Sequence, residues 1–373
     1  MRVLVLSCNT GEGHNAAGRA VQEALCARGH HCDFLDMLGL VGENYSRRVS
    51  KAYVFVANRA PRFFQMLYGA GDFISSSRTK SPVYWVNRLY RGKILRQIER
   101  GNYAAVVTPH LFPAQTLTSL RREGRLRGIH TVAVATDYTC IPFWEETECD
   151  YYVLGHPDLV AEFAAKGIPE EKLLPYGIPV KRAFSQEGDR GEARRELGLP
   201  PEGPVVLIMS GSMGHGKLDA LADRLLKEGG DALSLVVVCG NNRELLEKLQ
   251  GRFCDRENIR LLGFTQQVAR YMEACDVLLT KPGGLTTTEA AVKGVPMVHT
   301  APIPGCETVN ARFFSQREMS VTGKTLREQV QSARILWEEP SARRAMLEAQ
   351  RRNIGRRAAE DVCDLLERLT EGG

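Results

Sequence analysis

Long apolar runs are missing from this sequence. A helix that crosses a bilayer needs about 18 to 20 consecutive apolar residues, and no run among the 373 residues approaches that length. Met1 and Arg2 lead directly into a predicted strand at 3–6, without the charged and apolar regions of a signal peptide. These absences argue against a membrane-spanning chain, and we expect a cytoplasmic protein.

Paired cysteines and metal-binding motifs are missing as well. The ten cysteines occur singly, with no Cys-x-x-Cys pair and no histidine at zinc spacing. Reduced thiols are therefore the simplest interpretation. The sequence also has no Asp-x-Asp motif, so we expect neither a metal site nor a bound cofactor.

The composition predicts a soluble globular protein of two domains. Hydrophobic residues make up 43% and charged residues 25% of the chain, which is typical of globular proteins, and the length allows two cores. Proline and glycine at 174–180 mark a boundary, so we expect domains at 1–178 and 179–373. The helical, charged end of the chain after Asn310 is expected to cross back toward the first domain.

Short apolar runs alternate with helix-forming segments, which predicts α/β folds. The predicted strands of the first domain are 3–6, 103–108, 132–135 and 151–154, and those of the second are 205–209, 235–238, 259–262, 277–280 and 295–298. Ligands of such folds gather at the carboxyl ends of the strands. The loops that follow these runs are therefore the candidate sites.

The segment 276–317 has the strongest chemical signal. Its strand at 277–280 is followed by Pro282-Gly283-Gly284 and by a predicted helix at 286–293. Glycines let the backbone approach a ligand closely, and the free N–H groups of a helix N-terminus suit a phosphate. Glu289, one turn further on, is within reach of hydroxyl groups on the molecule that carries the phosphate.

Four further loops of the second domain also follow predicted strands. The glycine-rich loop 210–217 is a candidate phosphate cradle, although it lacks the Gly-Lys-Ser/Thr pattern of a P-loop. The loops at 239–242 and 263–265 repeat the unit of strand and loop, and 303–307 forms a loop after the strand at 295–298.

A glycine-rich loop at 11–16 connects the first strand to a helix predicted at 17–28. Its Gly-x-Gly-x-x-Ala spacing, with Asp33 and Asp36 about 20 residues further on, is compatible with a dinucleotide-binding fingerprint. The loop therefore allows a nicotinamide oxidoreductase as one interpretation.

The segment 45–100 is both basic and aromatic. It holds twelve arginine and lysine residues against two acidic ones, a net charge of +10 in a chain whose total is +5, and 10 of the 27 aromatic residues. Such interleaving is typical of helices at a membrane interface, and nucleic-acid binding requires a similar composition. Core aromatics with a solvated basic face are the third interpretation.

Four motifs in these loops resemble one family. KPGGLTTTEA at 281–290 and PIPGCETVN at 302–310 are similar to the donor-nucleotide signature of the GT-B glycosyltransferases that include monogalactosyl- and processive glucosyl-diacylglycerol synthases. These enzymes are related to the peptidoglycan N-acetylglucosaminyltransferase. GEGHNA at 11–16 and TDYTCIPFW at 136–144 are similar to two further motifs of the same family.

The resemblance implies a GT-B fold, with two doubly wound, Rossmann-like α/β domains that face a cleft. It implies transfer of a hexose from a UDP-sugar to a diacylglycerol-type hydroxyl, with inversion at the anomeric carbon. Without a metal, helix N-termini and backbone N–H groups would stabilise the leaving UDP. The related enzymes take their lipid acceptor from the part that corresponds to 45–100, so we expect this segment to bind anionic membrane at the inner face of the cell membrane, and not nucleic acid.

By this resemblance the glycine turn binds the diphosphate, Glu289 binds the ribose, the loop 303–307 binds the hexose, and backbone near Phe264 binds uracil. Cys306 stands where the family has a glutamine. The donor-binding candidates are Gly211, Ser212, Gly214, Asn241, Phe264, Thr265, Val268, Pro282, Gly283, Gly284, Thr286, Glu289, Gly305, Cys306, Glu307 and Asn310.

On the acceptor side, the resemblance makes His14 the candidate base. Asp137 is a second candidate, either as the base or as the group that orients His14. A surface histidine that caps a helix, and an aspartate that caps a turn, are the structural alternatives. Ile141 replaces a histidine that is usual in the family. The candidates in the acceptor-side loop are Gly11, Gly13 and Asn15.

Three other functions remain compatible with these motifs. An isomerase of similar shape would epimerise the UDP-sugar without an acceptor, and a nicotinamide oxidoreductase would use the loop 11–16. A non-catalytic, membrane-associated sensor of nucleotide sugars is the third. UDP release that depends on added lipid distinguishes the transferase from the isomerase and the sensor, and NADH binding tests the oxidoreductase.

Overall fold

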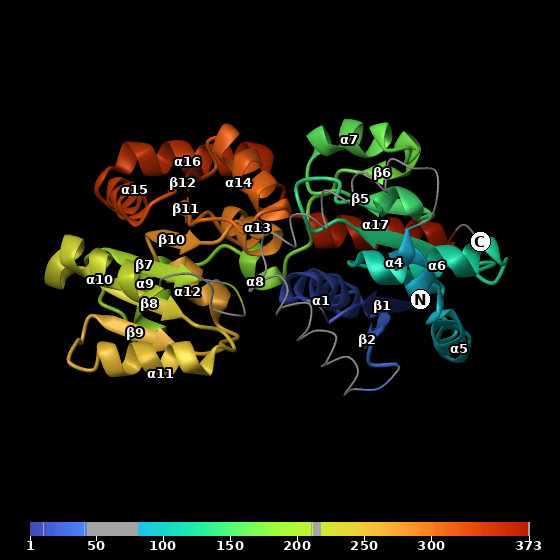
Figure 1. Ribbon diagram of the computed structural model, residues 1–373, viewed down its shortest axis with the longest axis horizontal. Coiled ribbons are helices and arrows are strands. Elements are labelled where there is room, and N and C mark those ends of the chain that lie inside the picture. The colour runs from blue at the N-terminus through green and yellow to red at the C-terminus, as the bar shows by residue number, and fades with distance from the viewer. Residues whose placement is uncertain (10, 41, 43–80, 210, 212–217, 372–373) are drawn as a thin grey trace. The chain divides into compact units, whose positions relative to one another are not determined.

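The computed structural model describes residues 1–9, 11–40, 42, 81–209, 211 and 218–371. The chain forms two compact units (Figure 1). Unit 1 contains Met1–Arg182, Pro304–Cys306 and Arg356–Gly373, and unit 2 contains Ala183–Ile303 and Glu307–Gly355. Much of the predicted membrane-docking segment, from 43 to 80, lies outside the described residues, as do Ser212 and Gly214.

Unit 1 is built on a six-stranded sheet of order β2-β1-β3-β4-β5-β6, in which neighbouring strands pair in parallel. The strands are β1 (Arg2–Ser7), β2 (His31–Asp36), β3 (Ala105–Thr108), β4 (His130–Val134), β5 (Tyr151–Val153) and β6 (Leu173–Leu174). Val3 and Val5 of β1 face one core and Leu4 and Leu6 face the other. Continuous apolar strands are expected when both faces of a parallel sheet are covered.

The helices of unit 1 cover both faces of this sheet. They are α1 (Glu12–Ala27), α4 (Pro82–Arg88), α5 (Arg91–Gly101), α6 (Leu111–Arg122), α7 (Val160–Ala165) and α17 (Ala358–Glu371), with short 3₁₀ helices at Trp144–Glu146, Pro157–Leu159 and Glu170–Lys172. The last helix of the chain, α17, packs beside α1 (Figure 1). Its Val362 and Leu366 are fully buried in the same core as Val3 and Val5, so the end of the chain completes the core around its beginning.

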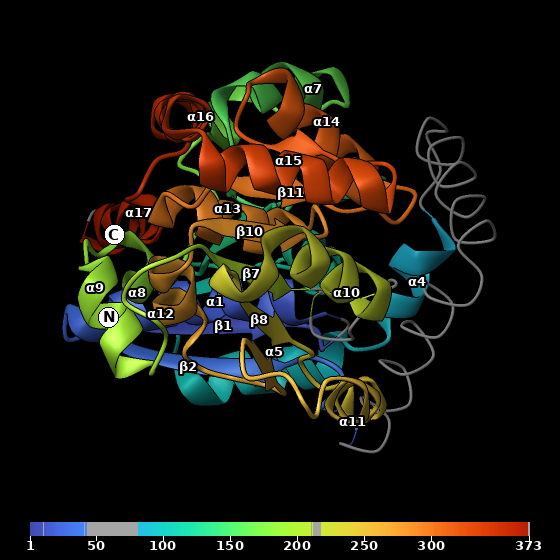
Figure 2. The ribbon, with the colours of Figure 1, turned by 90° about the vertical axis from the view of Figure 1, so that its left-hand side faces the viewer.

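Unit 2 has a second parallel sheet, of order β12-β11-β10-β7-β8-β9. Its strands are β7 (Val205–Met209), β8 (Ser234–Val238), β9 (Ile259–Leu262), β10 (Val277–Thr280), β11 (Met297–His299) and β12 (Val321–Thr322). Its helices are α9 (Arg190–Glu196), α10 (Leu218–Gly229), α11 (Arg243–Arg252), α12 (Val268–Ala274), α13 (Gly284–Lys293), α14 (Cys306–Gln316), α15 (Leu326–Glu338) and α16 (Pro340–Asn353), after a short α8 (Arg182–Ser185) and with a 3₁₀ helix at Gly230–Ala232. Helix α15 lies along β10 and β11 (Figure 2).

A buried ion pair connects helix α9 to the first residues of β7 and β10 in unit 2. Asp276, which precedes β10, accepts hydrogen bonds from Arg194 at 2.7 Å, from Arg190 at 2.6 Å and from the backbone N–H of Val205 at 2.8 Å. Asp276 and Arg194 are both almost fully buried. Because a buried charge is costly unless it is paired, these contacts lock α9 onto the start of the two central strands.

Two features of the fold differ from the expectations above. The sequence predicted a loop at 11–16, but α1 begins at Glu12, with extended backbone at Gly11 before it. An acidic residue in the first turn of a helix is favourable. The strands β2, β6 and β12 were not predicted: β2 is an edge strand of mixed polarity, and β6 and β12 have two residues each.

Among the helices of the residues described above, none is long and apolar enough to cross a bilayer.

Candidate functional site

Each sheet has one point at which the connections turn in opposite directions. In unit 1 this switch point lies between β1 and β3, and in unit 2 it lies between β7 and β10. Loops at the carboxyl ends of strands separate at such points, and open α/β sheets bind ligands there. Several candidate residues of each half lie at these two positions, and the others follow neighbouring strands.

At the switch point of unit 1, His14 lies in the first turn of α1. Its Nδ1 is 3.0 Å from the carbonyl oxygen of Pro109, which follows β3, and 2.8 Å from Oγ1 of Thr136, which follows β4. A carbonyl oxygen can only accept, so Nδ1 carries the proton of the neutral ring and Nε2 carries the lone pair. The surrounding backbone therefore selects the tautomer in which Nε2 is basic.

Burial lowers the pKa of His14 below its usual value of 6.5, while the Asp137 carboxylate and the Pro109 carbonyl act to raise it. The ring of His110 packs edge-on against His14, with 4.6 Å between the ring centroids. Burial, together with His14, lowers the pKa of His110 well below its usual value. Both imidazoles are therefore neutral near pH 7. His14 is not merely a surface histidine that caps a helix, because it is half-buried and contacts two other loops.

Asp137 lies in the loop after β4, directly after Thr136. Helix α7 holds this loop through Glu162, whose carboxylate accepts hydrogen bonds from the Thr139 hydroxyl at 2.7 Å and the Cys140 N–H at 2.8 Å. A fixed loop keeps the Asp137 charge close to His14, as its effect on the pKa of His14 indicates. The sequence did not single out Glu162.

The loop residues before and within α1 have mixed roles. Gly11 precedes the helix with extended backbone, whereas Gly13 and Asn15 are helical. The Asn15 side chain accepts from the Ser7 hydroxyl at 2.7 Å and donates to Asn9 at 3.2 Å, which ties α1 to the end of β1. Gly18 was missed: a Cβ there would lie 2.9 Å from the side chain of Val5, so only glycine permits this close packing of α1 on β1.

The dinucleotide interpretation relied on Asp33 and Asp36. In the structure, Asp36 accepts hydrogen bonds from the backbone N–H groups of Asn9, Leu38 and Gly39. Asp33 accepts from the Tyr103 hydroxyl at 2.6 Å. Both carboxylates thus hold neighbouring segments of unit 1 in place, a structural role that requires no ribose.

At the switch point of unit 2, the turn Pro282-Gly283-Gly284 ends β10 and starts α13. The helix begins at Gly284, two residues before the predicted start, so its first N–H groups lie at the carboxyl edge of the sheet. Glu289 is buried in the second turn of α13. Asn310 of α14 donates to the carbonyl oxygen of Pro282 at 3.2 Å. Asn310 and Pro282 are both predicted to bind the sugar nucleotide, and the Asn310 side chain thus stabilises the turn that contains Pro282.

Glu307, at the start of α14, is paired with a residue that the sequence did not single out. Nζ of Lys281 is 2.6 Å from Oε1 of Glu307, and the backbone N–H of Ile303 donates to Oε2 at 2.9 Å. Gly305, before α14, has φ of 119°, a conformation that favours glycine. Lys281 is the residue directly before the glycine turn, and only its charge in an apolar context could have signalled this role.

The remaining donor candidates occupy loops after β7, β8 and β9. Gly211 has φ of 74° and lies against Lys281. Asn241 is in the turn before α11, and Val268 is the first residue of α12. Thr265 accepts from the backbone N–H of Gln267 at 3.1 Å. The side chain of Phe264 is 64% exposed, so an apolar ring is available at this edge of the sheet.

Two doubly wound parallel sheets, each with candidate residues at its switch point, define a GT-B fold with two Rossmann-like domains. Solved structures agree. MurG of Acinetobacter baumannii has a TM-score of 0.62 at 16% identity, with 98% of this chain and 99% of that chain covered. A UDP-GlcNAc 2-epimerase of Neisseria meningitidis, solved with UDP-GlcNAc, has a TM-score of 0.62 at 12% identity, with 99% and 100% covered.

The sequence comparisons are more specific than the fold. The monogalactosyldiacylglycerol synthase model matches residues 14–180, and the C-terminal domain model of glycosyltransferase family 28 matches residues 205–332. These matches place residues 14–180 with the monogalactosyldiacylglycerol synthases and residues 205–332 with glycosyltransferase family 28.

Individual relatives fit this assignment. The processive diacylglycerol β-glucosyltransferase of Staphylococcus carnosus is 29% identical over 64% of this chain, and the alignment spans 60% of that protein's length. The Bacillus subtilis protein of the same name is 26% identical over 86% of this chain and 82% of its own. The chloroplastic monogalactosyldiacylglycerol synthase of Spinacia oleracea is 26% identical over 94% of this chain and 68% of its own.

Proposed function

We propose that the protein transfers a hexose from a UDP-sugar to the hydroxyl of a diacylglycerol-type lipid, with inversion at the anomeric carbon. One observation carries the proposal: the Nδ1 of His14 is bound to the Pro109 carbonyl, which leaves Nε2 as the basic nitrogen of a ring whose pKa the Asp137 charge raises. An alcohol is a poor nucleophile at neutral pH, so such a base is what an acceptor hydroxyl needs. The family assignment supports the same reaction.

In this mechanism the acceptor hydroxyl donates its proton to Nε2 of His14 as its oxygen attacks the anomeric carbon. The attack comes from the face opposite UDP. The bond from the anomeric carbon to the diphosphate oxygen breaks, UDP leaves with the electron pair, and the configuration inverts. Asp137 stabilises the imidazolium that forms, because its carboxylate favours the charged ring.

The donor occupies unit 2 in this proposal. The N-terminus of α13 binds the diphosphate, because its unpaired N–H groups and helix dipole favour an oxyanion without a metal. Glu289 accepts from the ribose hydroxyls, Phe264 and its neighbours contact uracil, and Glu307 accepts from the hexose. Each of these residues lies at the carboxyl edge of the second sheet or in the helix that follows it.

The acceptor side docks on anionic membrane, from which the lipid is taken. The described part of the basic, aromatic segment has an apolar face on and just after α4, where Trp85 is 54%, Val86 53% and Leu89 77% exposed. The guanidinium of Arg88 lies 5.5 Å from the centroid of the Trp85 ring. Apolar side chains beside arginines suit the boundary between headgroups and acyl chains. The protein would then associate with the inner face of the cell membrane.

A UDP-sugar epimerase is the second candidate, because the solved Neisseria meningitidis epimerase shares the fold at the same TM-score as MurG. The two functions differ in their need for an acceptor. We would incubate the full chain with vesicles of diacylglycerol and anionic phospholipid and with a panel of UDP-hexoses. A hexosyl-diacylglycerol mass in the lipid extract, with UDP release that requires diacylglycerol, supports the transferase. An epimerised UDP-sugar without a lipid product would reject it.

A further inference from the structure

Lys281 connects three loops at the switch point of unit 2. It follows β10, its ammonium pairs with Glu307 after β11 at 2.6 Å, and its side chain crosses Gly211 after β7. A Cβ on Gly211 would lie only 2.6 Å from Cε of Lys281. The three strands are neighbours in the sheet. The Lys281 side chain therefore links three loops at the carboxyl edge of the sheet, where the sugar nucleotide is proposed to bind.

The contacts of Glu307 leave its carboxylate little freedom to rotate. Lys281 binds one oxygen, and the backbone N–H of Ile303 binds the other at 2.9 Å. The Glu307 side chain is only 10% exposed. A carboxylate offers about four lone-pair positions, so each oxygen retains one with which to accept a hydrogen bond from a ligand hydroxyl. The pair therefore presents a fixed acceptor.

The neighbouring residue makes this acceptor more important. Cys306 occupies the preceding position, and a thiol is a weak hydrogen-bonding group. A strong side-chain contact with a sugar hydroxyl from these two positions must come from Glu307. The orientation of Glu307 then determines which hydroxyl arrangement is accepted.

We propose that Lys281 is a positioning residue for sugar selectivity, which holds the Glu307 carboxylate against one hydroxyl of the hexose in a nucleoside-diphosphate hexose. The proposal rests on the proposed transferase function. It assigns Lys281 no contact with the reacting atoms. Without the ammonium, Glu307 can rotate, and the site loses its preference between hexoses that differ in the orientation of one hydroxyl.

The decisive variant is Lys281→Met, which keeps the alkyl chain across Gly211 and removes the charge. We would measure kcat/KM for UDP-glucose and UDP-galactose with diacylglycerol vesicles, and the Kd of UDP by calorimetry. We expect the ratio of the two kcat/KM values to fall at least about tenfold, the loss typical of one charged hydrogen bond. The Kd of UDP should stay within about threefold, because UDP lacks the hexose.

Two further variants complete the test. Glu307→Gln should reproduce the loss of preference, and combining it with Lys281→Met should add little, because the residues act as a pair. Lys248→Met is the matched control, since Lys248 is an exposed lysine of α11 that pairs with Asp219. Thermal unfolding of each variant monitors the fold.

The outcomes distinguish this inference from the proposed function. The inference is overturned, and the proposed function is not, if Lys281→Met leaves the ratio of the two kcat/KM values unchanged, or if it weakens UDP binding as much as it lowers that ratio. A wild-type protein that uses UDP-glucose and UDP-galactose equally well has the same consequence. A wild-type protein that neither binds UDP nor transfers a hexose overturns the proposed function, and the inference with it.

Discussion

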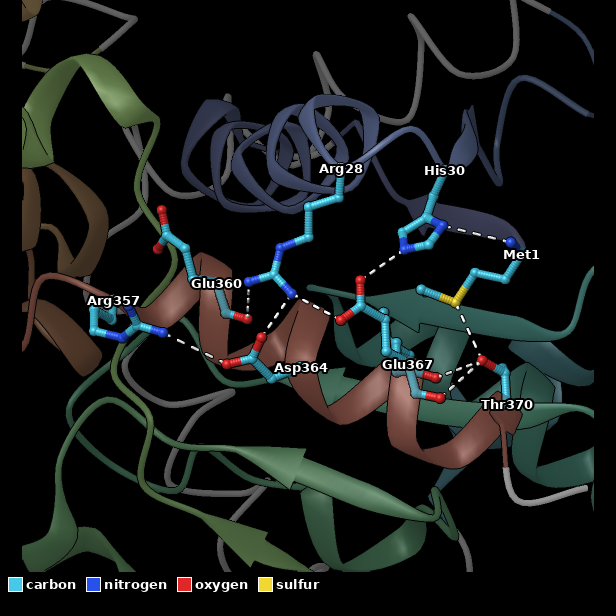
Figure 3. A network of polar contacts seen from close by, with 9 residues as sticks. Met1, Arg28, His30, Arg357, Glu360, Asp364, Glu367 and Thr370 are labelled. Atoms are coloured by element: carbon cyan, nitrogen blue, oxygen red, sulfur yellow. Dashed lines mark hydrogen bonds and ion pairs between the residues drawn. The ribbon is translucent and has the colours of Figure 1, made fainter.

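Arg28 and Asp364 are 336 positions apart in the sequence, yet a nitrogen of the Arg28 guanidinium lies 2.6 Å from a carboxylate oxygen of Asp364 (Figure 3). The same nitrogen is 2.9 Å from Glu367, which in turn accepts from His30 at 2.7 Å. These contacts join the end of α1 to α17. Surface ion pairs contribute little singly, so the buried side of α17 must provide most of the binding energy.

The first prediction concerns that buried side. Leu366 is fully buried in the core that contains Val3 and Val5. Leu366→Ala should lower the free energy of unfolding of unit 1 by about 2 to 5 kcal/mol, the cost of an unfilled cavity. Denaturant unfolding of the full chain measures this. Glu371→Ala, at an exposed position of the same helix, should change stability by less than about 0.5 kcal/mol; equal effects of the two would show that α17 does not contribute to the core.

The second prediction concerns acid. The hydrogen bond from His30 lowers the pKa of Glu367, with further lowering by the Arg28 charge. A carboxylate with a lowered folded-state pKa stabilises the fold above its unfolded pKa of about 4.3, and this contribution is lost as pH falls through the folded value. Stability should therefore decrease below about pH 4. The difference in the free energy of unfolding between the wild type and Glu367→Gln should vanish at acid pH. A difference that stays constant between pH 3 and 7 would show that ionisation of Glu367 does not contribute to stability.

Central strands of the two sheets are easier to predict from the sequence than edge strands. The strands at 205–209 and 277–280 were predicted with the same bounds, because apolar runs between loops leave little choice. The edge strand β9 was also predicted with the same bounds, from three apolar residues out of four. The edge strand β2 was missed because its sequence, HCDFLD, contains no apolar run. Local composition is sufficient for the central strands β7 and β10, whereas at the sheet edges it identified β9 but missed β2, β6 and β12.

Partners of the candidate residues could not be predicted in the same way. His14 meets Pro109 and Thr136, at separations of 95 and 122 residues, because β1, β3 and β4 are adjacent in the sheet. Lys281 meets Glu307 for a similar reason in the second sheet. Motifs identify the residue types, whereas strand order determines which of them touch.

The third prediction tests the ribose contact. Glu289→Ala should weaken UDP binding by about 1 to 3 kcal/mol, the range for a lost charged hydrogen bond. Calorimetry with UDP measures the change, and Glu289→Gln keeps the volume of this buried side chain. Glu338→Ala is the control, since Glu338 is an exposed residue of α15 that pairs with Arg334. Wild-type affinity in a folded Glu289→Ala protein would remove Glu289 from the site.

The fourth prediction tests the membrane face. Binding to vesicles should rise with anionic lipid and fall with salt, since each basic residue near the surface contributes about 1 kcal/mol. The double variant Trp85→Ser and Leu89→Ser should lower the bound fraction in co-sedimentation. Val321→Ser, at an exposed apolar position of β12, should not. Binding that ignores lipid charge, ionic strength and the double variant would leave the docking surface without support.

The last prediction tests the base. His14→Ala should lower turnover by about 10² to 10⁴-fold, the usual contribution of a general base. UDP affinity should stay nearly intact, because the donor is proposed to bind unit 2. His31→Ala serves as the control, since His31 is an exposed residue at the amino end of β2. Near-normal turnover in a folded His14→Ala protein would reject the assignment, and a large loss of UDP affinity would move His14 to the diphosphate.

The pH profile separates the role of Asp137 from that of the base. His14 works as a base only when neutral, so activity should fall as pH falls through its pKa, which burial places below 6.5. The Asp137 carboxylate raises this pKa, so Asp137→Asn should shift the acid limb of kcat to lower pH. The plateau should fall as well, because the imidazolium formed in the transition state loses its stabilising charge. If Asp137 were itself the base, Asp137→Asn would abolish the acid limb instead of shifting it.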